Sequence, residues 1–489
     1  MRPSEYAAYD ATGLAELVRR REITSVELAL SAIDAIEKVN PRLNAVVEIF
    51  PDLIDRLRRQ VQRTGVFAGV PILNKDLLAD AGRKLEMGSE LARGFVAPYT
   101  DSLLGRLKRQ GAVALGRTTT PEFGMATVTE SRIAGITRNP WDLDRTPGGS
   151  SGGSCAMVAA RAVPIATATD AGGSIRSPAA HCGLVGLKPS RGRISQMPFR
   201  ADPLVGLSVS FVVTRSVRDC ALALDVCQGR EPGDPYGMEV TAGSFTHSMR
   251  TPMARLRVAF AEAPWSGDRV SPEMLRGLHK TIGVLEARGH TVEQAMPKFD
   301  YSGFSSAILD VWCCNIVHSI DALAKKFGRQ PSCDNLQSSI LAYYRRGKKL
   351  TLDGLMNALG VIDNTNRIVG QFFQNYDLFV TPTCLSTAPR IGELNCDPAG
   401  EVDAERWDRS MNRIDAFMAV FNASGHPAIS VPVHSTDQGL PAGIQIVARF
   451  AEEERLIQAA LLLEEGLPWK DRYPACSVRV CPKSSCWIA

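Results

Sequence analysis

Short apolar runs rich in β-branched residues alternate with helical stretches along this 489-residue chain, and this alternation limits the folds open to it. FAGVPILNKDLL, GAVALGRTTT and RAVPIATATDAGG have the composition of buried strands, while DSLLGRLKRQG and SCAMVAARA lie between them with helical patterns. Strands that alternate with helices build a sheet whose faces the helices cover. The sequence therefore predicts an α/β fold with a large mixed, mostly parallel β-sheet core covered by helices.

The two ends of the chain extend this pattern. The first sixty residues are predicted to be helical, with Thr12 or Ser25 as helix caps and Pro41 behind the run SVELALSAIDAIEKV. RLRVAFAEA and HTVEQA are typical of strands that flank the helix SPEMLRGLHKTIGVLEARG. Residues 303–375 are predicted to be mainly helical. YDLFVTPTC, PAISVPV and GIQIVARF then return to strand before a last helix in EEERLIQAALLLEEGL.

The domain organisation follows from these elements, because no long linker and no internal repeat divides the chain. We expect one domain over residues 1–475. It begins with a helical segment over about 1–62, continues with a core over about 63–220, and includes a more variable region over about 300–420. Residues 476–489 fit no element and are predicted to be a disordered tail.

Composition narrows the classes of partner and compartment. The chain has 56 basic and 52 acidic residues, a formal net charge of +4, so we expect neither nucleic acid nor a membrane as a partner. No segment approaches ~18 uncharged apolar residues, and the N-terminus does not resemble a signal peptide. The twelve cysteines form no CxxC pair and no Cys/His cluster. We therefore expect reduced thiols, a cytoplasmic protein and no structural zinc site.

Two glycine–serine segments are the candidate chemistry of the chain. Pro147–Ser154 reads PGGSSGGS, which is either a flexible linker or a loop whose glycines let backbone approach a ligand. The apolar elements on both sides favour the loop. A second turn, TDAGGS at 169–174, ends a predicted strand and opens into a predicted helix. A compact helix–strand unit joins the two segments, which predicts that Ser150 and Ser174 face each other.

The second turn also suggests an oxyanion site. Backbone N–H groups collect where a strand end runs into a helix start. The N–H groups of Ala171, Gly172 and Gly173 are therefore candidates to hold the oxyanion formed when Ser174 attacks a carbonyl.

A serine nucleophile needs a base, and the residues alone leave its identity open. None of the seven histidines stands out by its spacing to an acid. Lys75 is the only charge in the run VFAGVPILNK. If it is buried, its pKa falls and the neutral amine can accept a proton. The alternative is a surface lysine or an ion pair with Asp76.

The stretch from Gly148 to Ser195, GGSSGGSCAMVAARAVPIATATDAGGSIRSPAAHCGLVGLKPSRGRIS, resembles the signature of the amidase signature family. AGVPILNKDL, RNPWDLDRTPGG, FNASGHPAISVPV and GLPAGIQIVA are similar to further motifs of that family, so the resemblance covers about residues 10–475. It implies the amidase signature fold. RNPWDLDR, GLKPSRGRIS and RSVRDCALALDV are most similar to one group of bacterial amidases.

Carried over position by position, the resemblance implies a catalytic triad. Ser174 is the nucleophile, Ser150 relays protons and Lys75 is the base. The family's Gly–Ser peptide bond is cis, which here implies a cis bond between Gly149 and Ser150. The residues expected to support this triad are Gly149, Ser151, Asp170 and Arg176.

The resemblance also implies the reaction. We expect hydrolysis of a carboxamide C–N bond through an acyl-enzyme, without metal or other cofactor, on a small-molecule amide or carbamate. Ester hydrolysis is open as well, because the same acyl transfer serves all three substrates. Trp312, Cys313 and Cys314 lie where relatives have pocket residues; they either touch substrate or pack in the core. The sequence leaves the oligomeric state, monomer or homodimer, open.

The sequence is also compatible with three other functions. Gly148–Gly152 also satisfies G-x-S-x-G, the nucleophile elbow of α/β-hydrolases, which would make Ser150 the nucleophile and a later histidine the base. The family also contains an amidotransferase subunit that passes ammonia to a misacylated tRNA within a complex. A catalytically inactive binding protein is the third interpretation. The presence of Lys75, Ser150 and Ser174 together speaks against it.

Overall fold

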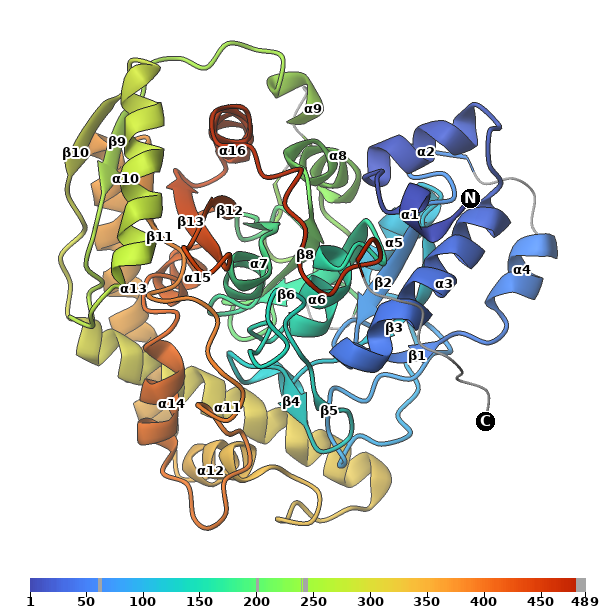
Figure 1. The fold of residues 1–489 in the computed structure, drawn as a ribbon. Helices are drawn as coiled ribbons and strands as arrows, with labels where there is room; N and C mark the ends of the chain where they lie inside the picture. Colours follow the sequence, from blue (N-terminus) through green and yellow to red (C-terminus); the bar gives the residue numbers. More distant parts are fainter. Residues whose placement is uncertain (60–63, 199–201, 239, 241–244, 481–489) are drawn as a thin grey trace.

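The structure is a computed structural model that describes residues 1–59, 64–198, 202–238, 240 and 245–480. Within these residues a large sheet forms the centre of the molecule and helices flank it (Figure 1). Its eleven strands are β1 (Val46–Ile49), β2 (Pro71–Lys75), β3 (Val113–Thr118), β6 (Ile165–Asp170), β7 (Val185–Lys188), β8 (Val209–Thr214), β9 (Arg257–Phe260), β10 (Thr291–Gln294), β11 (Leu378–Pro382), β12 (Ala428–Ser435) and β13 (Pro441–Ala448). A separate antiparallel pair consists of β4 (Glu130–Ser131) and β5 (Gly135–Ile136).

The strand order is β1-β3-β2-β6-β8-β7-β12-β13-β11-β9-β10. The predicted α/β class and mixed sheet are confirmed, but the expectation of a mostly parallel sheet is wrong. Among the described strands, six of the ten neighbouring pairs are antiparallel and four are parallel. The parallel pairs lie toward the two ends of the sheet. The central strands β6, β8, β7, β12 and β13 alternate in direction. For β12 and β13 the short connection requires this.

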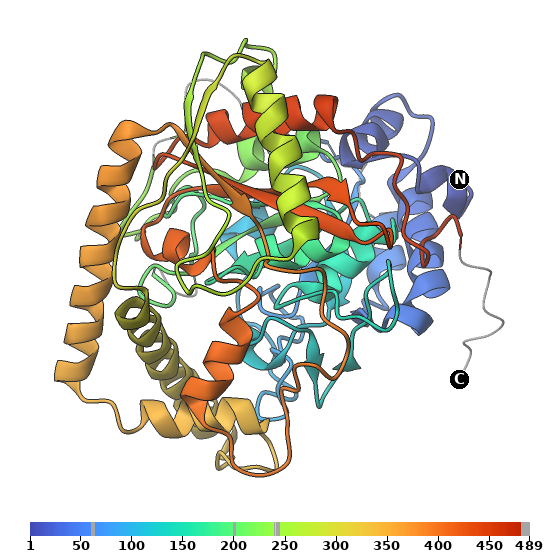
Figure 2. The same cartoon turned by 60° about the vertical axis from the view of Figure 1, so that its left-hand side comes forward.

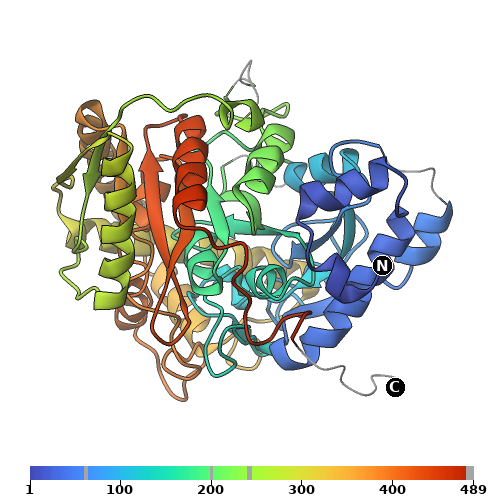
Figure 3. The ribbon, with the colours of Figure 1, turned by 45° about the horizontal axis from the view of Figure 1, so that its top comes forward.

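Helices cover the sheet as the sequence predicted. One row consists of α8 (Val217–Cys227), α10 (Pro272–Ala287) and α16 (Glu453–Gly466), which cross one face of the sheet (Figure 3). A second group, α6 (Gly152–Ala159) and α7 (Arg176–Cys182), packs against β6, β7, β12 and β13. Both α6 and α7 are entirely buried. The two signature segments are therefore held at the N-terminal ends of core helices.

The N-terminal helices gather at the β1–β3 end of the sheet (Figure 1). They are α1 (Pro3–Tyr6), α2 (Ala11–Arg19), α3 (Ser25–Leu43), α4 (Leu53–Arg59) and, further along the chain, α5 (Ser102–Arg109). The predicted caps are one or two residues off. Asp10 caps α2 through the N–H of Gly13, and Thr24 caps α3 in a reciprocal pair with Glu27.

A helical group packs together beside the sheet. It comprises α11 (Tyr301–Phe327), α12 (Ser338–Gly347), α13 (Leu352–Asn375) and α14 (Ala404–Asn412). In Figure 2, α11, α12 and α14 lie at the bottom and α13 lies along the left edge. Smaller helices are α9 (Phe245–Ser248), α15 (Ala419–Ala423) and the 3-10 turn Glu122–Gly124. Among the described residues, α11 alone is long and apolar enough to span a membrane by composition. Its apolar side chains pack into two hydrophobic clusters, on α13 and on α12, which accounts for that composition.

The start of the predicted disordered tail is ordered. Cys476, Ser477 and Val478 are buried, and their backbone contacts the body of the protein through the carbonyls of Pro140 and Ala160. The prediction is therefore wrong for residues 476–480. Residues 481–489, the rest of the predicted tail, lie outside the described residues.

Candidate active site

Lys75 is the last residue of β2, and its side chain has no exposed surface. Its nitrogen Nζ lies 2.8 Å from each of three hydroxyl oxygens, Ser150 Oγ, Ser151 Oγ and Thr169 Oγ1. The backbone N–H of Lys75 donates to Thr167 Oγ1 over 2.9 Å and fixes the end of the strand. The hydrogen-bond partners of this amine among the described residues are thus all hydroxyl groups.

The Lys75 amine is buried without a direct ion-pair partner among the described residues, although the charge of Asp170 acts on it from further away. Within the described residues it forms no ion pair, because its neighbour Asp76 pairs with Arg117 instead. Burial lowers the pKa of Lys75 from 10.5 to about 7. A large share of this amine is neutral at physiological pH and can accept a proton from a hydroxyl group.

Ser150 and Ser151 reach Lys75 from the glycine-rich loop at the start of α6. The Gly149–Ser150 peptide bond is cis, as the resemblance implied. The backbone at Gly149 is packed so closely that an added Cβ would lie 2.6 Å from the carbonyl oxygen of Ala126. These glycines therefore serve close packing in an ordered loop, and the linker interpretation is wrong.

Ser174 belongs to the turn between β6 and α7. Its side chain lines the same cavity as Ser150 and Thr169. The turn passes through Gly173, whose φ of +140° is a conformation that favours glycine. The two glycine–serine segments, separate in the sequence, thus bring Ser150 and Ser174 to one cavity.

A buried ion pair holds this turn. Asp170 and Arg176 are both 0% exposed, and the Arg176 guanidinium donates to both Asp170 oxygens over 2.9 Å. The same carboxylate accepts the N–H groups of Gly173 (2.8 Å) and Ile175 (3.1 Å). Although burial opposes it, the Arg176 charge keeps the pKa of Asp170 well below its usual range. The carboxylate therefore stays ionised and ties both ends of the turn together.

Changing Asp170 to alanine is expected to lower the free energy of unfolding by about 3–5 kcal/mol, because Arg176 would stay buried without its partner. Urea denaturation measures this difference. A matched control is Glu16→Ala, which removes an exposed carboxylate paired with Arg19 and Arg20 and should leave the free energy of unfolding nearly unchanged. Equal effects of the two changes would contradict the role given to the buried pair.

The predicted oxyanion site needs a correction. The N–H of Gly173 is already bound to Asp170, which removes it from the predicted set of three donors. Within the described residues, the N–H groups of Ala171 and Gly172 have no hydrogen-bond acceptor, and both residues line the cavities beside Ser174. The oxyanion donors are thus reduced to these two amides because the third one orders the turn.

Two cavities meet at Ser174. The larger, of about 190 Å³, also contains Ser150 and Thr169, and the smaller, of about 50 Å³, contains Gly172. The larger has a polar wall made of Asp101, Ser195, Gln196, Ser208, Ser210, Asn315 and Ser319. The smaller is lined by Trp312, Tyr343 and Met411 together with Asp408, Asn412 and Asp415. Apolar side chains also line the larger cavity, namely Leu77, Leu78, Leu103, Phe123, Met125, Pro203 and Leu204. A substrate that reaches Ser174 therefore has a mixed compartment rich in hydroxyl and amide groups on one side and a smaller compartment with aromatic and carboxyl groups on the other.

Helix α11 supplies residues to both cavities. Trp312, Asn315 and Ser319 follow at three- and four-residue steps, so they lie on one face of the helix. Cys313 is buried in the cluster with α12, and Cys314 does not line either cavity. Of the three residues predicted for the pocket, only Trp312 faces it, because its neighbours along the chain point about 100° and 200° away.

The amidase family model matches residues 27–457. The chain belongs to the amidase family. A 6-aminohexanoate-cyclic-dimer hydrolase from Pseudomonas sp. (strain NK87) is 35% identical over 476 residues, 95% of this chain and 96% of that protein. The solved structure of a 6-aminohexanoate cyclic dimer hydrolase complexed with substrate aligns with a TM-score of 0.91 and 34% identity, over 96% of this chain and 99% of that one.

A more distant relative is a glutamyl-tRNA(Gln) amidotransferase subunit from Neisseria meningitidis serogroup B (strain ATCC BAA-335 / MC58). It is 29% identical over 94% of this chain and 98% of that protein. The predicted family and its bacterial branch, that of 6-aminohexanoate cyclic-dimer hydrolase, are confirmed. The amidase is an enzyme that hydrolyses carbon–nitrogen bonds.

Sequence reasoning missed several residues of the amidase site. Thr169 supplies the third hydroxyl group at Lys75. Its only distinguishing feature in the sequence is its place in the TATD run at the end of a strand. Asn315 and Ser319 follow from Trp312 by helical spacing, a signal that was present in the sequence. Asp415 reaches the site from a distant segment, and no local pattern marks it.

The surroundings of Ser150 do not match the nucleophile elbow of an α/β-hydrolase. The side chain that hydrogen bonds Ser150 is Lys75, not a histidine. His181, which lies near the glycine loop, is buried, and burial lowers its pKa to about 4. Ser150 follows a loop rather than a strand. The nucleophile elbow therefore does not describe this segment. Within the described residues, no cluster of three or more His, Cys, Asp or Glu side chains could hold a metal ion.

Proposed function

We propose that the enzyme cleaves an amide C–N bond through an acyl-enzyme on Ser174, with Ser150 as proton relay and Lys75 as base. The observation that carries the proposal is the 2.8 Å contact between Lys75 Nζ and Ser150 Oγ in the wall of the cavity that contains Ser174. An amine buried among hydroxyl groups, with its pKa lowered to about 7, has the properties of a base for serine.

The proton path follows from the order of the groups. Neutral Lys75 takes the proton of the Ser150 hydroxyl, and Ser150 takes that of Ser174 as the Ser174 oxygen bonds to the carbonyl carbon. The oxyanion receives hydrogen bonds from the N–H groups of Ala171 and Gly172. The proton then returns through Ser150 to the nitrogen, the C–N bond breaks and the amine leaves. Water, activated by the same relay, hydrolyses the ester on Ser174 and releases the acid.

The proton relay determines which cavity holds the amine part of the substrate and which holds the acyl part. The departing nitrogen must receive its proton from Ser150, which lines only the larger cavity. The amine part of the substrate therefore lies in the larger cavity. The acyl part lies in the smaller one, beside Gly172 and Trp312.

The smaller cavity favours an uncharged acyl group. Trp312, Tyr343 and Met411 give it apolar surface. Burial raises the pKa of both Asp408 and Asp415 to about 7, so these carboxyl groups are partly protonated near neutrality and can donate or accept hydrogen bonds. Together with the similarity to cyclic-dimer hydrolases, this supports uncharged aliphatic amides, linear or cyclic, as the substrate class.

Changing Trp312 to alanine is expected to open the smaller cavity and to raise kcat/KM for a bulky acyl amide about tenfold relative to a short one. The ratio of kcat/KM for two amides that share their amine measures the change. Cys314→Ala, on the same helix but outside the cavities, should leave the ratio unaltered. A second pair of amides, with one acyl group and two amines of different size, tests the alternative. If Trp312→Ala changed the ratio of kcat/KM for that pair instead, the assignment of the two cavities would be reversed.

The reaction type is tested with an amide, a carbamate and an ester. An amide and an ester with the same acyl group form the same acyl-enzyme, so the ester should show a burst of alcohol release followed by the shared rate of deacylation. Hydrolysis of the amide confirms the C–N activity. Carbamate or ester turnover without any amide turnover would contradict the proposed substrate class.

A further inference from the structure

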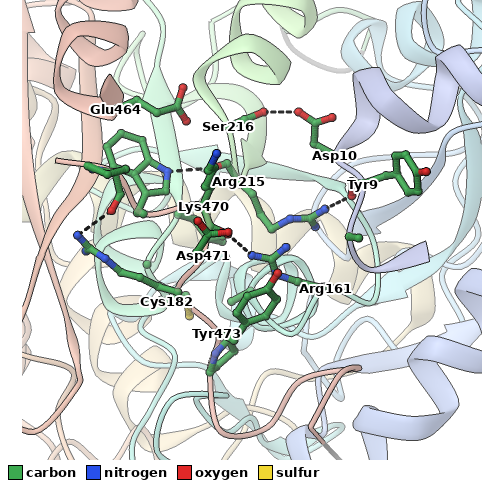
Figure 4. Close-up of a pocket in the computed structure, with 18 of the residues that line it drawn as sticks. Tyr9, Asp10, Arg161, Cys182, Arg215, Ser216, Glu464, Lys470, Asp471 and Tyr473 are labelled. Carbon is green, nitrogen blue, oxygen red and sulfur yellow. Dashed lines mark hydrogen bonds between the residues drawn. The ribbon is translucent and has the colours of Figure 1, made fainter. Parts of the chain in front are cut away.

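A third cavity, of about 520 Å³, shares no lining residue with the two cavities at Ser174. It lies where α6 and α7 end, and the start of α8 and the segment 468–474 complete its wall (Figure 4). The reacting serines lie at the opposite, N-terminal ends of α6 and α7. The proposed amide chemistry makes no use of this cavity.

Two arginines face this cavity without a carboxylate partner. Arg161 donates to the carbonyl oxygens of Ala7 (3.2 Å) and Lys470 (2.6 Å). Arg215 donates to the carbonyl oxygens of Val163 (3.1 Å) and Tyr9. Within the described residues neither guanidinium forms an ion pair. Each guanidinium has five N–H donors, so these bonds leave some of its N–H groups available to a ligand. Burial, and next the charge of Arg215, lower the pKa of Arg161 to about 10, so the two cations oppose each other.

The backbone of Arg161 gives a second, independent indication. Its φ is +63°, in the left-handed region, just after the end of α6. Glycine or asparagine is the usual residue at such a position, because other side chains cost conformational free energy there. Strained residues of this kind persist where the surrounding structure holds them, and they cluster at ligand and active sites. The Arg161 guanidinium lies over the ring of Tyr473 at 3.9 Å.

The remaining walls define the kind of anion. Trp141 and Trp469 line the cavity, and their indole N–H groups are bound to the carbonyls of Cys182 and Arg215. The rings therefore offer apolar surface rather than donors. The charged lining residues are Arg161, Arg215, Arg218, Lys470 and Arg472 against Asp10, Glu464 and Asp471. This excess of two positive charges favours an anion, and the aromatic surfaces favour an anion with an apolar body over inorganic phosphate.

We propose that this cavity is a binding site for a small organic carboxylate, whose oxygens bond the Arg161 and Arg215 guanidiniums and whose apolar body lies against Trp141, Trp469 and Tyr473. Guanidinium groups bind carboxylates through two parallel N–H···O bonds. The competing explanation is that the arginines only satisfy carbonyl groups and the negative ends of α6 and α7. That explanation predicts no ligand.

Calorimetric titration of the full chain with benzoate separates the two explanations. Benzoate is expected to bind, and Arg161→Gln and Arg215→Gln should each weaken it about tenfold or more. Arg218→Gln is the matched control, because Arg218 lines the same cavity but is paired with Asp10; it should change the affinity less than twofold. Neutral benzamide and inorganic phosphate should bind at least tenfold more weakly than benzoate at the Arg161 site.

A crystal of the unchanged protein soaked in 4-bromobenzoate keeps the proposal testable if the arginine variants do not fold. Anomalous scattering should locate bromine between Trp469 and Tyr473. Bromine only beside Ser174, or none at all, would overturn the proposal. So would benzoate affinity that Arg161→Gln leaves unchanged, or phosphate that binds more tightly than benzoate.

Discussion

Replacing Ser174 with alanine is expected to lower kcat for an amide substrate by about 10⁵-fold, an effect of the size seen when a nucleophile is removed from a hydrolase triad. The amide carbonyl would still enter the site, but no oxygen would be placed to attack it. KM should change little, because the cavities on both sides of Ser174 remain in place. Steady-state kinetics on one amide, with the folded state checked by circular dichroism, measures both quantities.

The control for this change is another serine in the same wall. Ser195→Ala removes a hydroxyl from the larger cavity, away from Lys75, and should change kcat less than about fivefold. If Ser174→Ala and Ser195→Ala had similar small effects, Ser174 would not be the nucleophile and the proposed mechanism would be wrong.

Replacing Lys75 with methionine is expected to lower kcat/KM by about 10³- to 10⁴-fold, because Ser150 and Ser174 would keep their places but lose their base. In the unchanged enzyme, kcat/KM should rise as pH increases through about 7 and level off above it, since the active form has a neutral Lys75. A pH–rate profile of kcat/KM shows this step. A profile that is flat from pH 6 to pH 9 would contradict the role of Lys75 as base.

Stability should respond to the same group with a definite sign. The pKa of Lys75 is lowered on folding, so between about pH 7 and 10.5 the unfolded chain binds more protons than the folded one. The free energy of unfolding therefore increases as pH rises through this range. Below about pH 7 Lys75 is charged in both states, and the folded state carries the full cost of burying that charge. Lys75→Met removes that cost, so at pH 6 the inactive variant should be at least as stable as the unchanged enzyme. This outcome would separate loss of the base from loss of the fold.

Much of the fold could be predicted because periodicity is a local property. The helix at Pro272–Ala287 and the strands on both sides of it each follow from a single continuous run of the sequence. Strand direction could not be predicted in the same way. β8 follows β7 in the chain, yet it lies between β6 and β7 in the sheet, and this insertion makes both contacts antiparallel. Such an order depends on contacts between distant segments.

In the candidate site, too, local features could be predicted and contacts between distant segments could not. Glycine chemistry indicated the loops of Ser150 and Ser174, but composition alone could not distinguish a surface Lys75 from a buried one. Its three hydroxyl partners come from segments 75 to 94 residues further along the chain. The oxyanion donors illustrate a different limit. The N–H of Gly173 is adjacent to Ser174 in sequence, but Asp170 engages it, and only the turn geometry shows this.

The most direct test of the account is the position at which a fluorophosphonate bonds to the protein. Trypsin separates the candidates, because Ser174 lies in the peptide 162–176 and Ser150 in the peptide 146–161. Mass spectrometry should find one label per chain, on Ser174, with labelling slowed in the Lys75→Met variant. A label on Ser150, or labelling at full rate without Lys75, would contradict the proposed triad.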